Sequence, residues 1–240
     1  MRPDDVAPQF GNPKFDQFAR FFLYPSFLLA HRIRWQGAQN VPRTGGAIIA
    51  ANHQSFYDPV ILTMAAQRRI IYMGLDKYFA YPLLGMLMRA FDCIPVDQDA
   101  RISMAYARLV RMLREGRLCG IFPEGGITLD GFVHAPWPGV GALVLDSGAP
   151  VVPVTIHGAS RAWPRHRALP CPAPIQMCFG TPMTFDVSCP AQNAHTRRAA
   201  IARQVMLRVC EGFEKLGRPD LAEAGHRNVR AGKDNDSQTD

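Results

Sequence analysis

Short apolar runs alternate with helix-forming segments along most of this chain, and this alternation limits the folds that it can adopt. Strand-like runs occupy residues 45–52, 69–74, 93–96, 151–156 and 174–180, and helical patterns occupy 100–115, 139–147 and 195–216. Brief apolar runs between turn residues are typical of strands buried on both faces. Strands that alternate with helices predict the α/β class, with a mostly parallel central sheet flanked by helices.

The length of the chain predicts one such domain with additional segments at its ends. With 240 residues and 48% apolar side chains, the chain can bury one sizeable core without disulfides or metals. We expect a membrane-associating helical segment at 1–35, the α/β domain at 36–216, and a flexible tail at 217–240, where the sequence becomes polar.

Two apolar segments suggest contact with a membrane. Residues 14–31 are apolar with cations at their flanks, a pattern that predicts a helix in a membrane interface or one packed on its own domain. The run 21–30 is too short to span a bilayer, which needs about 20 apolar residues. Residues 78–91 are apolar nearly all round, so they are either buried or membrane-facing. With no signal peptide evident at the start, we expect peripheral attachment at the cytoplasmic face.

The net charge of +7 is compatible with nucleic acid, anionic lipid headgroups or an acidic carrier protein as partners. No segment resembles an RNA- or DNA-binding motif, so nucleic acid is disfavoured. The basic and aromatic run 161–167 is a candidate contact for headgroups or a carrier protein, with a solvated loop as the alternative. None of the six cysteines forms a CxxC pair, which disfavours a zinc ribbon or a redox dithiol.

Polar residues follow directly after the strand-like run 45–52, in the sequence NHQSFYDP at 52–59. Histidine is the usual base for taking a hydroxyl proton near neutral pH, and a carboxylate on its other ring nitrogen sets the tautomer. His53 and Asp58 are separated by about 140° on a continuous helix. They can therefore pair only if a helix begins between them, which makes His53 a candidate base and Asp58 its partner.

A second polar cluster, FPEGG at 122–126, follows the sequence RLCGI at 117–121, which also predicts a strand. Its glycines let the backbone approach a ligand closely and expose N–H groups. Glu124 can bind hydroxyls of a substrate or help to hold the site. The alternative is a tight glycine turn with a solvated glutamate.

Together the two clusters resemble those of the glycerolipid acyltransferases, in particular the lysophosphatidate acyltransferases. The family's NHxSxxD block, with its HX4D spacing, matches residues 52–58, and its FPEG block matches 122–125. A short apolar block between them is matched weakly at 93–97, and a later VPV strand is matched at 152–154. The four blocks occur in the family's order and cover residues 45–158.

The resemblance implies an α/β fold and transfer of a fatty acyl group to a hydroxyl of a lyso-lipid, as in 1-acylglycerol-3-phosphate O-acyltransferases of phospholipid synthesis. It also implies membrane lipids as partners, acyl-CoA or acyl-carrier protein as donor, and no metal or other cofactor. In this family pattern His53 is the general base and Asp58 is its partner. The substrate-binding residues implied in the same way are Asn52, Ser55, Phe122, Pro123, Glu124, Gly125, Gly126 and Arg101.

Three positions depart from the family pattern. The family usually has an arginine, linked to the acceptor phosphate, where this chain has Gln98, and Arg101 follows three residues later. The Thr-Arg that often follows FPEG is Gly-Ile at 126–127, and a later Phe-Lys pair is Pro-Trp at 136–137. A phosphate monoester needs charge-assisted hydrogen bonds, which arginine supplies best. Unless Arg101 substitutes, we expect a preference for an acceptor without a phosphate monoester, such as a lyso-aminolipid.

Other functions are disfavoured by particular residues. A non-catalytic lipid-binding relative would have no need of the intact set His53, Asp58 and Glu124. A serine hydrolase is disfavoured because Ser55 does not lie in a GxSxG sequence. His157, which follows the strand-like run 151–156, either lines the site or has a structural role.

Overall fold

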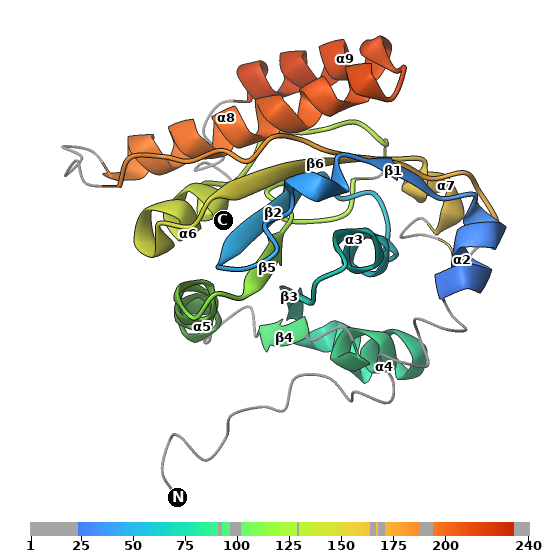
Figure 1. Cartoon of the computed structure of the whole chain (residues 1–240), viewed down its shortest axis with the longest axis horizontal. Helices are drawn as coiled ribbons and strands as arrows, with labels where there is room; N and C mark the ends of the chain where they lie inside the picture. The colour runs from blue at the N-terminus through green and yellow to red at the C-terminus, as the bar shows by residue number, and fades with distance from the viewer. Residues whose placement is uncertain are drawn as a thin grey trace, which may run out of the picture.

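The computed structural model describes residues 24–90, 93–96, 102–128, 130–163, 167, 171–187 and 194–232, coloured along the chain in Figure 1. In this part of the chain the strands form a seven-stranded sheet with the order β1-β7-β6-β2-β5-β3-β4. The strands are β1 Arg34–Gln36, β2 Ala47–Ala51, β3 Ile70–Leu75, β4 Cys93–Val96, β5 Leu118–Ile121, β6 Val151–His157 and β7 Gln176–Phe179.

The sheet is mostly parallel, as the sequence predicts. β2 lies between β5 and β6 and is parallel to both, while β3 is parallel to β5 and β4. β7 pairs antiparallel with β6 and parallel with β1, so this edge of the sheet runs against the rest. The carboxyl ends of β2, β5 and β6 therefore lie at one edge, where α/β folds place their ligand-binding loops.

Helices cover both faces of the sheet (Figure 1). Ile49 of β2 shares a buried cluster with Leu62, whereas Ile48 shares another with Leu109 and Leu143. Since side chains alternate across a strand, adjacent residues of β2 supply opposite cores. The helices are α2 Tyr24–His31, α3 Asp58–Ala66, α4 Pro82–Ala90, α5 Ile102–Arg114, α6 Gly139–Ser147, α7 Ala159–Ala162, α8 Ala194–Lys215 and α9 Pro219–Ala231, with short 3-10 helices η3 Ala38–Asn40 and η4 Asp76–Ala80.

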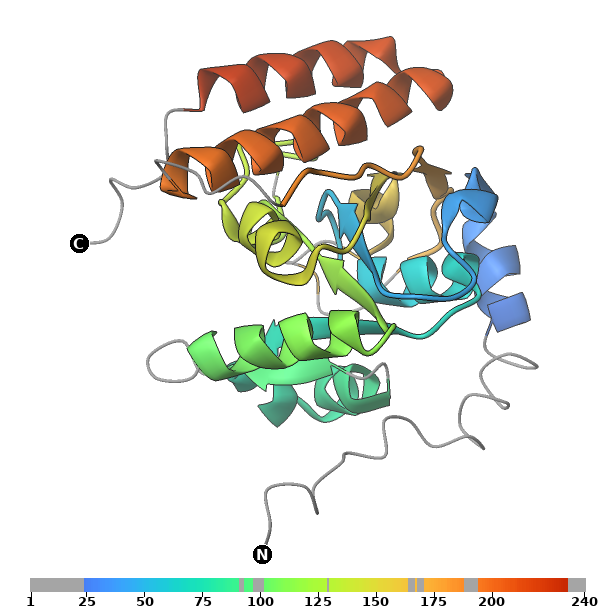
Figure 2. The same ribbon diagram turned by 60° about the vertical axis from the view of Figure 1, so that its left-hand side comes forward.

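The chain after Gly217 differs from the flexible tail that its polar composition predicts. Over Pro219–Ala231 it forms α9, which lies side by side with α8 in Figure 2. Ala222 and Val229 of α9 are buried in a cluster with Phe213 of α8. A few small apolar residues at helical spacing are enough to dock a helix whose other face is solvated, and such a stripe is hidden in an average composition. Residues 233–240 lie outside the described part.

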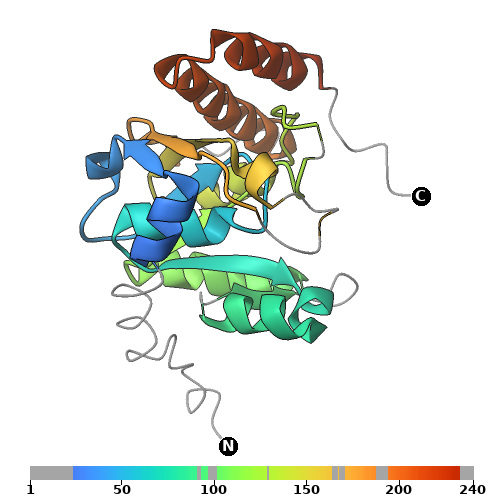
Figure 3. The same cartoon turned by 90° about the vertical axis from the view of Figure 1, so that its right-hand side faces the viewer.

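The N-terminal membrane-associating segment predicted at 1–35 is described only from residue 24. This part forms α2, one of the blue segments in Figure 3. Phe27 of α2 packs edge to face on Tyr57, with ring centroids 4.5 Å apart, while Leu29 is 82% exposed. The second apolar segment forms η4 and α4, where Tyr81 and Met86 are exposed. Among the described residues, no helix combines the length and hydropathy needed to cross a bilayer.

Candidate active site

Two loops meet at the carboxyl edge of the sheet, one after β2 and one after β5. Ala50 of β2 lies beside Ile121 of the parallel strand β5, so both loops leave the sheet together. The rings of His53 and Phe122 stack, with centroids 3.9 Å apart and planes inclined by 12°. The two polar clusters, which are far apart in the sequence, thus form one site.

His53 and Asp58 form a hydrogen-bonded pair in this site. Asp58 lies in the first turn of α3, and His53 Nδ1 is 2.8 Å from its Oδ2. The same oxygen accepts backbone N–H bonds from Gln54 and Ser55, at 2.6 and 2.8 Å. Asp58 is fully buried, whereas 16% of the His53 side chain is exposed. The chain therefore bends before α3 in the way that pairing of these two residues requires.

The carboxylate of Asp58 determines which nitrogen of His53 is basic. An ionised carboxylate only accepts hydrogen bonds, so Nδ1 carries the proton and Nε2 keeps its lone pair. Within the described residues no hydrogen bond to Nε2 occurs, and the ring is partly exposed. Nε2 can therefore take a proton from a hydroxyl group that reaches the ring.

Asn52 and Ser55 hold the loop itself, in contrast to the substrate contacts predicted for them. The side-chain amide of Asn52 donates to the Ile156 carbonyl at 2.9 Å and accepts from the Ile156 N–H at 2.8 Å. Ser55 Oγ donates to the Trp163 carbonyl at 2.8 Å and accepts from the Tyr57 N–H at 3.1 Å. Both side chains are buried, and these bonds connect the loop to β6 and to Trp163.

Glu124 connects the backbones of two loops. Its Oε2 accepts the N–H of His53 at 2.7 Å, and its Oε1 accepts the N–H of His134 at 2.8 Å. Burial raises the pKa of Glu124 to about 8, although the two backbone N–H bonds favour the charged form. Of the two roles that the sequence allows for Glu124, these contacts favour holding the site.

The glycine turn after Glu124 is held by the residues around it. The Gly125 N–H donates to the Phe122 carbonyl at 3.0 Å, and the Trp137 N–H donates to the Pro123 carbonyl at 2.8 Å. Gly125 has a φ of 77°, a conformation that residues with a Cβ rarely adopt. Gly126 is exposed, with nothing within 4 Å of the position that a Cβ would take. This side of the turn is therefore open to a ligand.

Sequence reasoning missed two residues that support His53. Gln54 is buried and its Nε2 donates to the Gly131 carbonyl at 2.8 Å. The N–H of Thr128 donates to the His53 carbonyl at 2.9 Å. Glutamine and threonine are not residue types that predict support of a catalytic loop. The one signal in the sequence is the position of Gln54 within the NHQSFYD block.

The remaining candidates are Arg101, the run 161–167 and His157. Arg101 and Gln98 are outside the described residues, as are parts of the run 161–167. His157 is half-buried, and its Nε2 is 3.0 Å from Arg218 NH1, at the turn between α8 and α9. Burial, together with the nearby Arg218 and Arg161, lowers the pKa of His157. These contacts support the structural role for His157.

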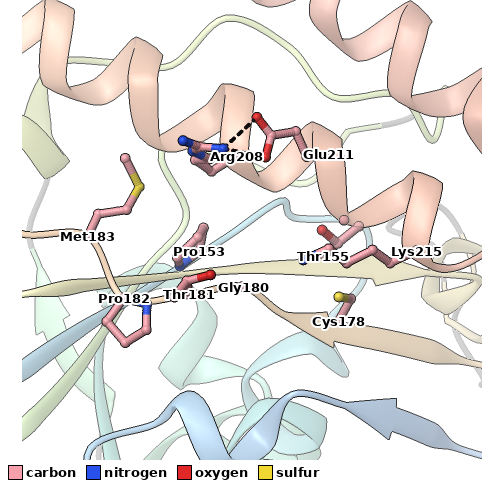
Figure 4. A pocket seen from close by; sticks show the side chains of 11 residues that line it. Pro153, Thr155, Cys178, Gly180, Thr181, Pro182, Met183, Arg208, Glu211 and Lys215 are labelled. Atoms are coloured by element: carbon pink, nitrogen blue, oxygen red, sulfur yellow. Dashed lines mark hydrogen bonds and ion pairs between the residues drawn. The ribbon is translucent and has the colours of Figure 1, made fainter.

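A separate hollow of about 220 Å³ lies between β6, β7 and α8 (Figure 4). Pro153 and Thr155 of β6 line it, and they point away from the face where Val154 packs with Tyr57. Three of its polar side chains are engaged within the protein, since Arg208 pairs with Glu211 and Thr155 Oγ donates to a backbone carbonyl of α8. We assign no chemistry to this hollow.

Comparison with known proteins identifies related sequences and a related fold. Residues 32–157 match the family described as Acyltransferase. A protein from Mycobacterium leprae is 30% identical over 65% of this chain and 44% of its own length. A protein named 1-acyl-sn-glycerol-3-phosphate acyltransferase, from Borreliella burgdorferi, is 26% identical over 52% of this chain and 50% of its own length. The chain thus spans about half the length of these relatives.

A solved structure shares the fold. PlsC, the 1-acyl-sn-glycerophosphate (LPA) acyltransferase from Thermotoga maritima, superposes with a TM-score of 0.66 at 20% identity. The superposition covers 85% of this chain and 78% of that structure. The α/β fold predicted from the sequence is confirmed by this match.

The raised pKa of Glu124 predicts a pH-dependent contribution to stability. Because the folded-state pKa of about 8 exceeds the ordinary value of 4.5, folding takes up a proton between these pH values. The stability that Glu124 adds is fully present below pH 4.5 and is lost as the pH rises towards 8. The free energy of unfolding of the native protein, relative to Glu124→Gln, should therefore fall across this range. Urea denaturation at several pH values measures the difference, and a pH-independent difference would contradict the raised pKa.

Proposed function

The chain belongs to the acyltransferase family, and we propose that it transfers a fatty acyl group from a thioester donor to the hydroxyl of a lyso-lipid. One observation carries the proposal. The His53 Nδ1 proton is held by buried Asp58, which leaves Nε2 as the basic nitrogen in a partly exposed ring. Relatives named as 1-acyl-sn-glycerol-3-phosphate acyltransferases support the same reaction.

In the proposed reaction His53 Nε2 removes the proton of the acceptor hydroxyl as the oxygen attacks the thioester carbonyl carbon. A tetrahedral intermediate forms and its carbon–sulfur bond breaks, which releases the acylated lipid and a thiolate. The imidazolium of His53 then gives the proton to the departing sulfur. Asp58 stabilises the imidazolium while it carries the positive charge.

The intermediate also needs a donor for its negatively charged oxygen. The Gly125 N–H already donates to the Phe122 carbonyl, so it does not serve as a donor to the intermediate. The neighbouring Gly126 is exposed and has open space beside it, so we propose its backbone N–H as a donor. The resemblance leaves acyl-CoA and acyl-carrier protein open as acyl donors, and neither requires a metal or other cofactor.

Replacing the base tests the proposal. We expect His53→Ala to lower kcat by about 10²–10⁴-fold while the protein stays folded. In the Asp58→Asn variant kcat should also fall steeply, because an amide cannot stabilise the imidazolium and favours the wrong tautomer of His53. Transfer of a labelled acyl group to a lyso-lipid measures both, with His195→Ala as a control histidine on α8.

A folded His53→Ala variant that retained more than half of the native activity would exclude His53 as the base. Absence of transfer in the native protein, with lyso-lipid binding retained, would instead support a non-catalytic lipid-binding relative.

Two acceptors have support from different observations. The names of the relatives favour 1-acylglycerol-3-phosphate, and we propose it as the acceptor with Arg101 as the phosphate contact. The glycine and isoleucine at 126–127 favour an acceptor without a phosphate monoester, such as a lyso-aminolipid, because neither residue carries a cation.

Competition between acceptors distinguishes them. If Arg101 binds the phosphate, Arg101→Ala should lower kcat/KM for 1-acylglycerol-3-phosphate by about 10- to 150-fold, since a hydrogen bond to a charged group contributes roughly 1.5–3 kcal/mol. The same variant should leave neutral and zwitterionic lyso-lipids nearly unaffected. A higher kcat/KM of the native protein for a lyso-lipid without the phosphate monoester would establish the second acceptor class.

We also propose that the protein attaches to the cytoplasmic face of a membrane as a peripheral protein. Leu29 of α2, Tyr81 and Met86 are large apolar side chains that are exposed. The sequence places further aromatic residues, Phe21 and Phe22, next to α2. Apolar side chains beside cations favour the interface of an anionic bilayer.

Flotation with anionic vesicles tests the attachment. Changing both Phe21 and Phe22 to Ser should move protein from the vesicle fraction to the soluble fraction, because buried apolar area is lost from the membrane contact. Val187→Ser, which changes an exposed apolar residue outside these segments, is the control. Unchanged flotation of the double variant would count against attachment through this segment.

A further inference from the structure

The loop 130–137 lies between the glycine turn and α6, and its centre is buried beneath the last two helices. Val133 of this loop is 1% exposed and belongs to the same cluster as Phe213 of α8 and Val229 of α9. The loop is therefore packed against a helix that the sequence presents as a polar tail.

Two residues of α9 lie against this loop at Val133. The side-chain amide of Asn228 donates to the Val133 carbonyl, with Nδ2 3.0 Å from the oxygen. Gly225 allows the close approach, because a Cβ at this position would lie 2.7 Å from Cys210 Sγ and 3.3 Å from Val133 Cβ.

The other side of the same loop faces the catalytic histidine. The His134 N–H donates to Glu124 Oε1 at 2.8 Å, and Glu124 Oε2 accepts the His53 N–H at 2.7 Å. Gln54, the residue after His53, donates to the Gly131 carbonyl at 2.8 Å. The loop is thus connected to the His53 segment twice, once through Glu124 and once through Gln54.

One peptide unit connects the two sets of contacts. The Val133 carbonyl and the His134 N–H belong to a single planar peptide group, which cannot rotate internally at ordinary temperature. Asn228 holds the carbonyl end of this group, and Glu124 holds its N–H end. If the peptide plane tilts at the Val133 carbonyl, the His134 N–H moves with it, and its hydrogen bond to Glu124 changes.

We propose that Asn228 is a positioning residue for the reaction, since it orients the 133–134 peptide group that binds Glu124 and, through Glu124, the backbone of His53. The inference rests on the proposed acyl transfer. The general base must point at the acceptor hydroxyl, and a displacement of about 1 Å can lower a rate by roughly 10²-fold. Asn228 acts on the orientation of His53 and does not contact the substrate in this proposal.

Variants of Asn228 test the inference by a split between kcat and KM. Asn228→Ala removes the donor, and Asn228→Asp replaces it with a carboxylate that repels the Val133 carbonyl. We expect kcat to fall by about 10- to 100-fold in both variants, with the acceptor KM changed by less than about threefold. Glu223→Gln, on an exposed side chain of the same helix, should leave kcat and KM unchanged.

A stability control separates positioning from general loosening. Val205→Ala creates a cavity in the cluster on the α5 and α6 side, away from the loop. If Val205→Ala lowers the melting temperature as much as the Asn228 variants do, its kcat should still stay within about threefold of the native value. An equal fall of kcat in Val205→Ala, or an unchanged kcat in both Asn228 variants, would overturn the inference.

Amide hydrogen exchange gives a second readout that does not require activity. The amides of His53 and His134 should exchange at least about tenfold faster in Asn228→Ala than in Val205→Ala, because only the first variant releases the 133–134 peptide group. If the native protein transfers no acyl group, the proposed function fails, while the exchange result still decides whether Asn228 positions His53. Equal exchange rates at His53 in the two variants would overturn the coupling.

Discussion

The site depends on one buried oxygen, Oδ2 of Asp58, which accepts three N–H donors. Two donors are the backbone amides of Gln54 and Ser55, and the third is Nδ1 of His53. A buried carboxylate is costly unless it is hydrogen-bonded, so these bonds and the folded loop stabilise each other. The bend of the chain and the tautomer of His53 both follow from this one acceptor.

The rest of the site holds backbone groups rather than substrate. Asn52 binds both polar groups of Ile156 in β6, which joins the His53 loop to the neighbouring strand. Glu124 joins the His53 loop to the loop that follows the glycine turn. These backbone contacts add to the two that restrict the His53 side chain itself, the hydrogen bond to Asp58 and the stack on Phe122. The motif residues of this chain therefore divide into the hydrogen-bonded pair His53–Asp58 and the side chains that hold the backbone around it.

Parallel strands explain why residues so distant in the sequence cooperate. β2, β5 and β6 are neighbours that run in one direction, so the segments that follow β2 and β5 and the end of β6 meet at one edge of the sheet. Beyond this edge, α9 covers the loop that contacts Glu124 and buries Val133 with Phe213. The composition of α9 gives no indication of this contact, since only one stripe of the helix is apolar and the opposite side is charged.

The sequence by itself determined the α/β class, the approximate boundaries of most strands and of three helices, and the two clusters of the site, because strand and helix periodicity and the short NHQSFYD and FPEGG blocks are local properties. The sequence also suggested the His53–Asp58 pair, since both residues lie within one bend of the chain. Only the tertiary structure decided that Asn52 and Ser55 hold the loop, that Glu124 binds two backbone amides, and that α9 packs on the loop that contacts Glu124. The partners in these contacts are separated by 104, 71 and 95 residues for Asn52, Glu124 and Asn228. Hydrogen bonds between such distant residues depend on how strands and helices pack, and no local pattern in the chain encodes that geometry.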